Sequence, residues 1–294
     1  MDFFILSFAV TNGLLLGGIY GGVALGLSLI FGVLRVVNFA HGSFLMLSLY
    51  ISFWLWSIFG LDPYLSALIN IPAMFLLGFA VQALIISPLI KRESALVVEP
   101  LSALLLTAGI FLVLDNAALM AFGPDVRAVQ TSYYMPSLML GGIPVNSQRL
   151  IGAVAAVIVA AALSWWLRTS HLGRSIRATA QNRDAAAMSG INVPFVYAVT
   201  FGIGCGILGL FGALMSTFIP ISPSIGLSFG IKSFIVVVLG GLGSIPGCII
   251  GGIVIGVFEA VASQFVTATS AAIGSLALFV LILIFRPAGI MGRA

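Results

Sequence analysis

The chain has 294 residues, of which 61% are hydrophobic and only 7% are charged, and its mean hydropathy is +1.23. A soluble domain carries about 25% charged residues, so this chain has too few to cover a globular surface in water. The composition therefore predicts an all-α fold, a polytopic helical transmembrane bundle in which residues 1–294 form a single domain. The net charge of +4 comes mostly from arginine, and with lysine scarce we expect no nucleic-acid partner.

The first apolar stretch covers residues 3–34, which is longer than the roughly 20 residues that one crossing needs. It has no basic n-region and no cleavage site before it, so we expect a retained span that is long, tilted or broken. Glycines recur at every fourth position, which favours close helix packing inside the bundle over a specific dimer motif. The two glycine rows are Gly13, Gly17, Gly21 and Gly18, Gly22, Gly26.

A polar break follows directly, where Asn38, His41, Gly42 and Ser43 stand between two apolar runs with no loop of any length. An unsatisfied polar group costs several kcal/mol in hydrocarbon, so these side chains must face a cavity or a partner. Two interpretations remain open. The break is either a tight turn with a satisfied histidine, or a lining of the transport pathway.

Four more crossings are expected at residues 44–58, 64–86, 101–122 and 151–167. Lys91 to Glu93 marks a cytoplasmic loop, because basic residues near span ends stay inside. In the third of these crossings, Asp115 and Asn116 are expected to be an exposed cap near its far end and not a buried ion site. Residues 123–149 form the longest external segment, which suits an interfacial loop.

The longest polar interruption is residues 168–194, which hold four arginines and one acid, Asp184. The same charge rule predicts a cytoplasmic loop, and the number of preceding crossings agrees. Residues 175–189 contain no Gly or Pro and end at Gly190, which predicts one short helix with a glycine C-cap. Arg174 and Arg177 share a face of that helix if it starts before them.

A second break lies in the C-terminal part of the chain. Residues 195–219 and 248–266 are long enough to span, while residues 229–239 are too short to cross alone. A last crossing at residues 275–285 leaves the C-terminus inside, for a total of eight to ten spans. The short run leads into a broken segment of the kind that points to a transport site at membrane depth, formed by Gly240, Gly241, Gly243, Pro246 and Gly247.

The two breaks suggest a degenerate internal repeat. Each follows an apolar run, precedes a span and carries a Gly-Ser pair, Gly42-Ser43 in one half and Gly243-Ser244 in the other. Matched breaks in two halves are typical of duplicated transporter folds.

Several chemistries are not encoded. The chain has no GxxxxGK[ST] motif, so it cannot cradle a nucleotide itself, and Cys205 and Cys248 lie in apolar spans without metal-ligand spacing. We expect no enzymatic activity, no metal and no cofactor on this chain. The only acids inside spans are Asp115 and Glu259, which is few for a proton or sodium relay. Energy is therefore expected from another subunit.

Four segments in the right order carry a resemblance over nearly the whole chain. They are GGIYGGVALGLSLIFGVLRVVNFAHGSFLML, RSIRATAQNRDAAAMSGIN, VVLGGLGSIPGCIIGG and RPAGIMGR. The sequence resembles the permease subunits of bacterial ABC importers for branched-chain amino acids, the Liv type with its urea and amide relatives. The resemblance implies a multi-pass protein of the inner membrane, with a second related permease, two cytoplasmic ATPases and a periplasmic binding protein as partners.

The resemblance also assigns the polar loop a role. The coupling segment of such importers, in its general form EAAxxxG, corresponds to Asp184, Ala185, Ala186, Met188 and Gly190 here, with Asp in place of Glu. A carboxylate at the start of a short helix keeps its capping and dipole role after this change. The Ile-x-Leu-Pro that continues the wider motif is absent. Arg174 and Arg177 are expected to contact the ATPase or to anchor the loop at lipid headgroups.

The mechanism implied is alternating access, in which a cytoplasmic coupling loop at residues 168–194 transmits the closure of the ATPases. For the substrate pathway we expect Asn38, His41 and Ser43, with Ser244 as their counterpart. Leucine-type amino acids, other amino acids, urea and short amides are all compatible with the sequence. Two other classes stay open: an ion-coupled secondary transporter or channel for a small polar solute, and a membrane-embedded enzyme or scaffold.

Overall fold

The computed structural model describes residues 3–89, 101–130 and 137–292. Within these residues, eight helices are long and apolar enough to cross a bilayer, which confirms the predicted polytopic bundle. They are α1 (Phe3–Leu34), α2 (His41–Phe59), α3 (Pro63–Val81, continued by the π-helical turn η1, Gln82–Ile86), α5 (Leu101–Phe122), α6 (Ser147–Thr169), α9 (Val193–Met215), α11 (Ile245–Ala262) and α12 (Ala268–Phe285).

Shorter elements complete the fold. A ninth apolar helix, α10 (Ile225–Gly240), has 16 residues and is too short to cross alone, as expected. Two polar helices, α7 (His171–Gln181) and α8 (Arg183–Met188), follow α6, and a small hairpin of β1 (Leu138–Leu140) and β2 (Ile143–Val145) precedes it. The predicted loop at Lys91 to Glu93 lies outside the described residues.

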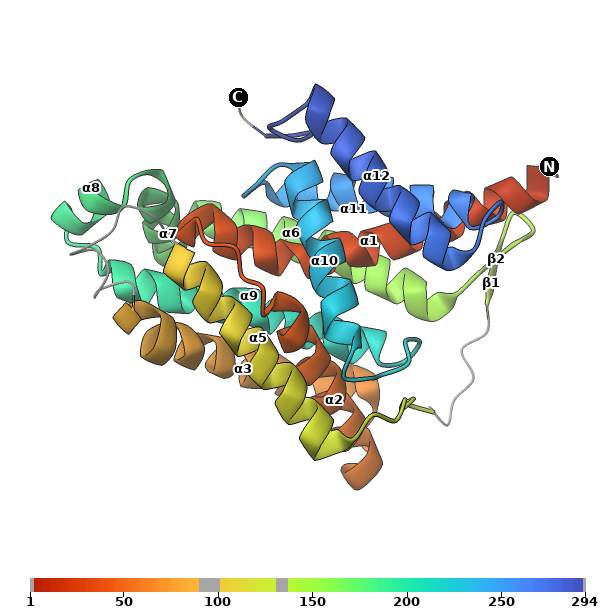
Figure 1. Cartoon of the computed structure of the whole chain (residues 1–294), viewed down its shortest axis with the longest axis horizontal. Helices are drawn as coiled ribbons and strands as arrows, with labels where there is room; N and C mark the ends of the chain where they lie inside the picture. Colours follow the sequence, from red (N-terminus) through yellow and green to blue (C-terminus); the bar gives the residue numbers. More distant parts are fainter. Residues whose placement is uncertain (1–2, 90–100, 131–136, 293–294) are drawn as a thin grey trace.

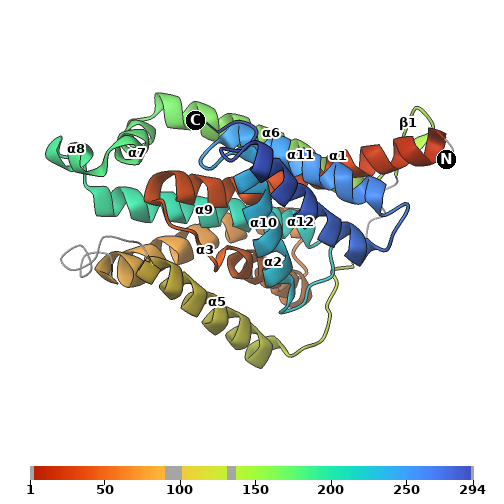
Figure 2. The same ribbon diagram turned by 45° about the horizontal axis from the view of Figure 1, so that its top comes forward.

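The bundle has two ends (Figure 1). One carries α7 and α8, and the other carries the β-hairpin and the start of α1, an arrangement that the rotated view repeats (Figure 2). The long helix α1 joins both ends. Near its start Arg149 donates a hydrogen bond to Asn12 (3.3 Å), and just past its end Arg35 donates to the carbonyl of Ala180 in α7 (3.4 Å).

The core is built around α1 and α9: in the apolar 18-residue stretch that would cross the bilayer, 83% and 89% of their residues are buried, against 17% in the corresponding stretches of α5 and α12. The glycine rows of α1 explain this close packing. Gly17 faces α11, where a Cβ would lie 2.6 Å from the carbonyl oxygen of Gly252, and Gly26 faces α9, where a Cβ would lie 2.5 Å from that of Gly204. Backbones approach this closely only through glycine, which confirms the packing interpretation.

The helices pack in two matching sets. Along their lengths α1 packs antiparallel on α11, and α3 packs antiparallel on α9. Similarly α2 contacts α9 and α5, while α10 contacts α1 and α12. The starts of α2 and α10 cross at Gly42, which packs directly on the backbone of Gly226.

This pattern pairs α1, α2, α3 and α5 with α9, α10, α11 and α12 as an internal repeat. Since α1 runs toward the α7–α8 end and α9 runs away from it, the two sets have opposite directions (Figure 1), the arrangement of inverted-repeat transporters. The expected repeat is therefore present, but the expected match of its breaks is wrong. The segment before α2 (35–40) corresponds to the segment before α10 (216–224), and not to the turn between α10 and α11.

Candidate functional site

The first break is an irregular segment, residues 35–40, that doubles back from the end of α1 to the start of α2. His41 lies against Gly26, eight residues before the end of α1, which places the start of α2 about 12 Å inside the bundle at a rise of 1.5 Å per residue. Two side chains satisfy the irregular backbone. Thr107 of α5 donates to the carbonyl of Val37 (3.2 Å), and the Asn38 side-chain oxygen accepts from the Ala40 amide (3.1 Å).

A pocket opens beside this segment, with a volume of about 120 Å³. Asn38 is its one polar side chain; it is only 3% exposed, and its Nδ2 has no hydrogen-bond partner among the described residues. An amide left unsatisfied at this depth costs about 1–3 kcal/mol, so it marks a place for a polar ligand atom or water. We call this the pathway pocket, lined by Leu27, Val37, Asn38, Phe39, Phe111, Leu227, Gly230, Ile231 and Phe234.

The other two predicted pathway residues of this break lie in the core and do not line the pocket. His41 is 1% exposed, and its Nε2 lies 3.1 Å from the carbonyl of Val23, so this nitrogen carries the proton. Ser43 is fully buried and donates to Asp115 of α5 (2.6 Å). Asp115 is thus half-buried inside α5 and tied to α2, so its expected role as an exposed cap is wrong, while Asn116 is exposed.

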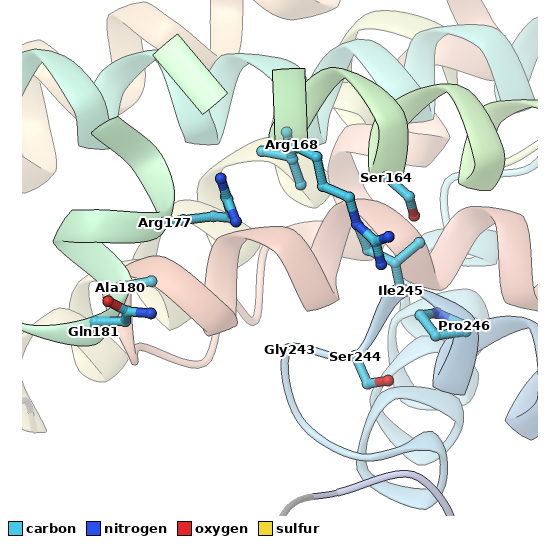
Figure 3. A pocket seen from close by; sticks show the side chains of 10 residues that line it. Ser164, Arg168, Arg177, Ala180, Gln181, Gly243, Ser244, Ile245 and Pro246 are labelled. Atoms are coloured by element: carbon cyan, nitrogen blue, oxygen red, sulfur yellow. The ribbon is translucent and has the colours of Figure 1, made fainter. Parts of the chain in front are cut away.

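Ser244 does not line the pathway pocket and lies near the ends of α6 and α7 instead. It caps α11 by accepting a hydrogen bond from the Gly247 amide (3.2 Å), and it borders a hollow of about 460 Å³. Arg168 at the end of α6 and Arg177 of α7 line the same hollow (Figure 3). The expected match of Ser244 with Asn38 is therefore wrong, because the two residues line different hollows and the helix packing matches the segment of Asn38 with residues 216–224.

The predicted helix breaks divide into two groups. Gly240 is the last residue of α10, and Gly241 and Gly243 have φ values of +105° and +80°, which only glycine adopts without strain. These three make the break. By contrast, Gly42, Pro246 and Gly247 lie in the first turns of α2 and α11, where they serve packing or helix initiation.

The predicted coupling helix at residues 175–189 is two helices. The chain is helical from His171 to Gln181, stops at Asn182, and resumes at Arg183. Asn182 has an extended backbone (φ −150°, ψ 110°), and its side chain accepts from the amides of Asp184 and Ala185 at 3.0 Å. An asparagine cap of this kind starts a new helix, so the local rule of no Gly and no Pro was insufficient to predict continuity.

The coupling residues from Asp184 to Met188 lie on α8, which protrudes from the bundle (Figure 1) and, among the described residues, packs mainly on α7 and α9. Ala186 is buried against the core, whereas Met188 is 84% exposed. Asp184 lies in the first turn, so it keeps the expected favourable place at the helix dipole, but the capping expected of it comes from Asn182. Gly190 has φ +82° and ends the helix as predicted.

Arg174 and Arg177 lie three apart on α7, which does begin before them. They nevertheless border different hollows. Arg177 lines the hollow of Ser244, while Arg174 donates to the carbonyl of Thr169 (3.0 Å) and lines a second hollow against the start of α9. Two further residues were not predicted from the sequence, because no local motif marks them. Arg168 lines the hollow of Ser244, and Thr107 bonds the irregular segment before α2.

Comparison with known proteins gives a consistent result. The family model described as "Branched-chain amino acid transport system / permease component" matches residues 9–285. The permease protein BraD of the high-affinity branched-chain amino acid transport system of Pseudomonas aeruginosa is 30% identical, over 97% of this chain and 95% of that protein.

The corresponding permease proteins LivH are similar to the same extent. That of Salmonella typhimurium is 33% identical and that of Escherichia coli K12 is 32% identical, each over 96% of this chain and 94% of the relative. No solved structure matches the chain.

Proposed function

The chain belongs to the family of permease components of branched-chain amino acid transport systems, and on this premise we propose that it imports branched-chain amino acids by ATP-driven alternating access. It does so in the bacterial inner membrane, paired with a second related permease and two cytoplasmic ATPases and supplied by a periplasmic binding protein. The chain itself is no enzyme and uses no cofactor. The single observation that carries this proposal is the family match over residues 9–285.

The α7–α8 end supports the coupling role. We assign it to the cytoplasm, because the arginines of residues 168–194 gather there. The exposed Met188 and the carboxylate of Asp184 on the protruding α8 offer an ATPase an apolar and a charged contact. On the other side of α7, Arg177 borders the turn between α10 and α11, so a movement of α7 reaches α10.

The pathway pocket supports the transport role. Apolar side chains from α1, α5 and α10 surround one unsatisfied amide, Asn38, a combination suited to an aliphatic side chain next to a polar group. Irregular backbone at membrane depth does not face lipid, yet Phe39 in the segment before α2 is 50% exposed. We infer that this face of the bundle, with α10 between α5 and α12 (Figure 1), is turned to the substrate pathway and the second permease.

The test is reconstitution of this permease with its second permease, ATPases and binding protein in proteoliposomes. We expect uptake of radiolabelled leucine that requires ATP and the binding protein together. Asn38→Leu fills the pocket and removes the amide, and we expect it to lower the rate of uptake about tenfold.

Two results would contradict the proposal. Leucine uptake by this chain alone, driven by a proton or sodium gradient without ATP, would instead establish the secondary transporter. ATP-dependent uptake of urea or of a short amide, with none of leucine, would keep the importer and overturn the substrate class.

A further inference from the structure

A charged cluster lies where α10 meets α1, α11 and α12. Lys232 Nζ is 2.8 Å from Glu259 Oε2 of α11 and 2.9 Å from the hydroxyl of Tyr20 in α1, and it also lies 4.5 Å from the centre of the Tyr20 ring. Ser275 of α12 donates to the other carboxylate oxygen of Glu259 (3.1 Å). Four helices therefore meet at this ion pair, and because Tyr20 is near the middle of α1, the pair lies at membrane depth.

Helix packing does not account for the charges. In the other half of the repeat, the equivalent seam between α2 and α3 is polar but neutral: Asn70 donates to Ser52 (2.6 Å), as does Ser66 (3.0 Å), and all three are fully buried. Neutral side chains thus suffice to join the two helices. An ion pair in the corresponding seam costs more, because both charges lose their hydration.

The ion pair is partly exposed, and on α10 it lies directly after a residue of the pathway pocket. The side chains of Lys232 and Glu259 are 25% and 14% exposed, and exposure to hydrocarbon at this depth is costly for a charge. Ile231 lines the pathway pocket, and Lys232 follows it on α10 in one row with the exposed Ser228, four residues earlier. Pocket and ion pair therefore occupy the two edges of one helix face.

The ammonium group also has unused hydrogen-bonding capacity. It carries three N–H donors, and the described residues supply two acceptors, the carboxylate of Glu259 and the hydroxyl of Tyr20. A carboxylate is the strongest acceptor for the third donor. The pair thus offers a charged contact to a ligand while remaining satisfied when the pathway is empty.

We propose that the Lys232–Glu259 pair binds the charged backbone of the transported amino acid on the wall of the pathway. Lys232 donates to the α-carboxylate, Glu259 accepts from the α-ammonium, and the pathway pocket takes the aliphatic side chain. A zwitterion loses the hydration of both charges in an apolar passage, and a neutral ion pair replaces both contacts at once. The proposal rests on the proposed function, since it needs an amino acid as substrate.

The experiment uses the complete importer in proteoliposomes, with radiolabelled leucine as the probe. Lys232→Gln combined with Glu259→Gln removes both charges and keeps hydrogen bonds between α10 and α11. We expect this double variant to assemble and to retain ATP hydrolysis stimulated by the binding protein, while leucine uptake falls tenfold or more, about the effect of losing one charge-assisted hydrogen bond. Unchanged uptake would overturn the proposal.

Exchanging the two charges distinguishes substrate binding by the ion pair from a purely structural role, in which the pair only clamps α10 to α11. Lys232→Glu combined with Glu259→Lys rebuilds the ion pair but moves the carboxylate-binding group from α10 to α11. A clamp predicts that uptake returns to the wild-type level, which would overturn the proposal, whereas substrate binding predicts that uptake stays low. This variant decides the question also if the neutral pair fails to assemble.

The matched control is Ser52→Ala in the neutral seam, which is expected to leave uptake per assembled complex unchanged. Loss of uptake in this control to the extent seen in the neutral pair would assign the effect to packing and overturn the proposal. Failure of the wild-type importer to take up leucine with ATP would instead count against the proposed function. The two failures are therefore distinguishable.

Discussion

At the scale of single residues, polar residues in an apolar sequence correctly marked where a helix is interrupted. They did not show which of the side chains faces the pocket and which is buried in the core. Asn38, His41 and Ser43 were predicted together, yet only Asn38 borders the pathway pocket. The other two are directed by packing: His41 toward a carbonyl of α1, and Ser43 toward Asp115. Side-chain direction depends on which distant helix packs against the break, and spacing along the chain does not contain that information.

Lys232 shows the opposite case. A lysine within an apolar run is a direct sequence signal for a functional site, and Glu259 follows in the next helix. Their pairing became visible only when α10 and α11 were side by side. The fold class could be predicted from the composition, because a chain surrounded by lipid needs few charged residues. The ion pair could not, because it depends on which helices pack together.

A substitution at Gly42 tests the crossing of α2 and α10. A Cβ there would meet the backbone of Gly226, and backbone cannot move aside as a side chain can. We expect Gly42→Ala to lower the stability by about 1–3 kcal/mol, measured as a lower unfolding temperature of the purified complex in detergent.

Gly109 of α5 is the matched control for that substitution, because a Cβ built on it has no atom of another described element within 4 Å. Gly109→Ala should leave the unfolding temperature unchanged or raise it slightly, since alanine has the higher helix propensity. Equal destabilisation by both substitutions would show that the crossing is looser than described.

At the scale of elements, the helical spans were predicted well, and the coupling segment only in part. Long apolar runs give unambiguous spans, with differences of up to seven residues at their ends. The division between α7 and α8 was missed, because residues 175–189 have favourable helix propensity throughout. The Asn182 side chain accepts hydrogen bonds from two amides at the start of α8. These bonds stabilise a break in the helix despite the favourable helix propensity of the segment.

Asn182→Ala should therefore weaken the coupling between the ATPases and the permease. Loss of an asparagine cap costs about 1 kcal/mol, which is a large share of the stability of a helix with six residues. We expect α8 to fray and ATP hydrolysis stimulated by the binding protein to fall several-fold in reconstituted complexes, with the amount of assembled permease unchanged.

Asn146 provides the control, since it caps α6 at the opposite end of the bundle in the same way, by accepting from the Arg149 amide (3.1 Å). Asn146→Ala should leave stimulated ATP hydrolysis within about twofold of wild type, because α6 has 23 residues and loses only its first turn. A deficit shared by both variants would place the defect in assembly and not in coupling.

At the scale of the whole molecule, the sequence showed that two halves exist but matched them wrongly. Two Gly-Ser breaks looked equivalent along the chain, whereas the equivalence in space follows from which helices pack together: α1 with α11, and α9 with α3. The long first helix of each half thus packs against the third helix of the other half, so neither half can bury its long helix alone. Their opposite directions bring the starts of α2 and α10 together inside the bundle, beside the pathway pocket.

This arrangement fixes a transmembrane orientation once the arginine-rich end is assigned to the cytoplasm. The turn between α11 and α12 then lies outside, together with the β-hairpin (Figure 2), and the end of α8 lies inside. The two cysteines of the chain are fully buried, so new cysteines at exposed positions can be labelled against a silent background. We choose Thr267→Cys in the turn and Ser189→Cys at the end of α8, both exposed.

A membrane-impermeant maleimide should modify Thr267→Cys in intact spheroplasts and Ser189→Cys only after permeabilisation. The reason is physical: basic segments are translocated poorly, so the four arginines of residues 168–194 retain α7 and α8 on the inner side. The reverse labelling pattern would place α8 outside, beyond the reach of a cytoplasmic ATPase. It would refute the coupling assignment while leaving the helix packing and the inverted repeat intact.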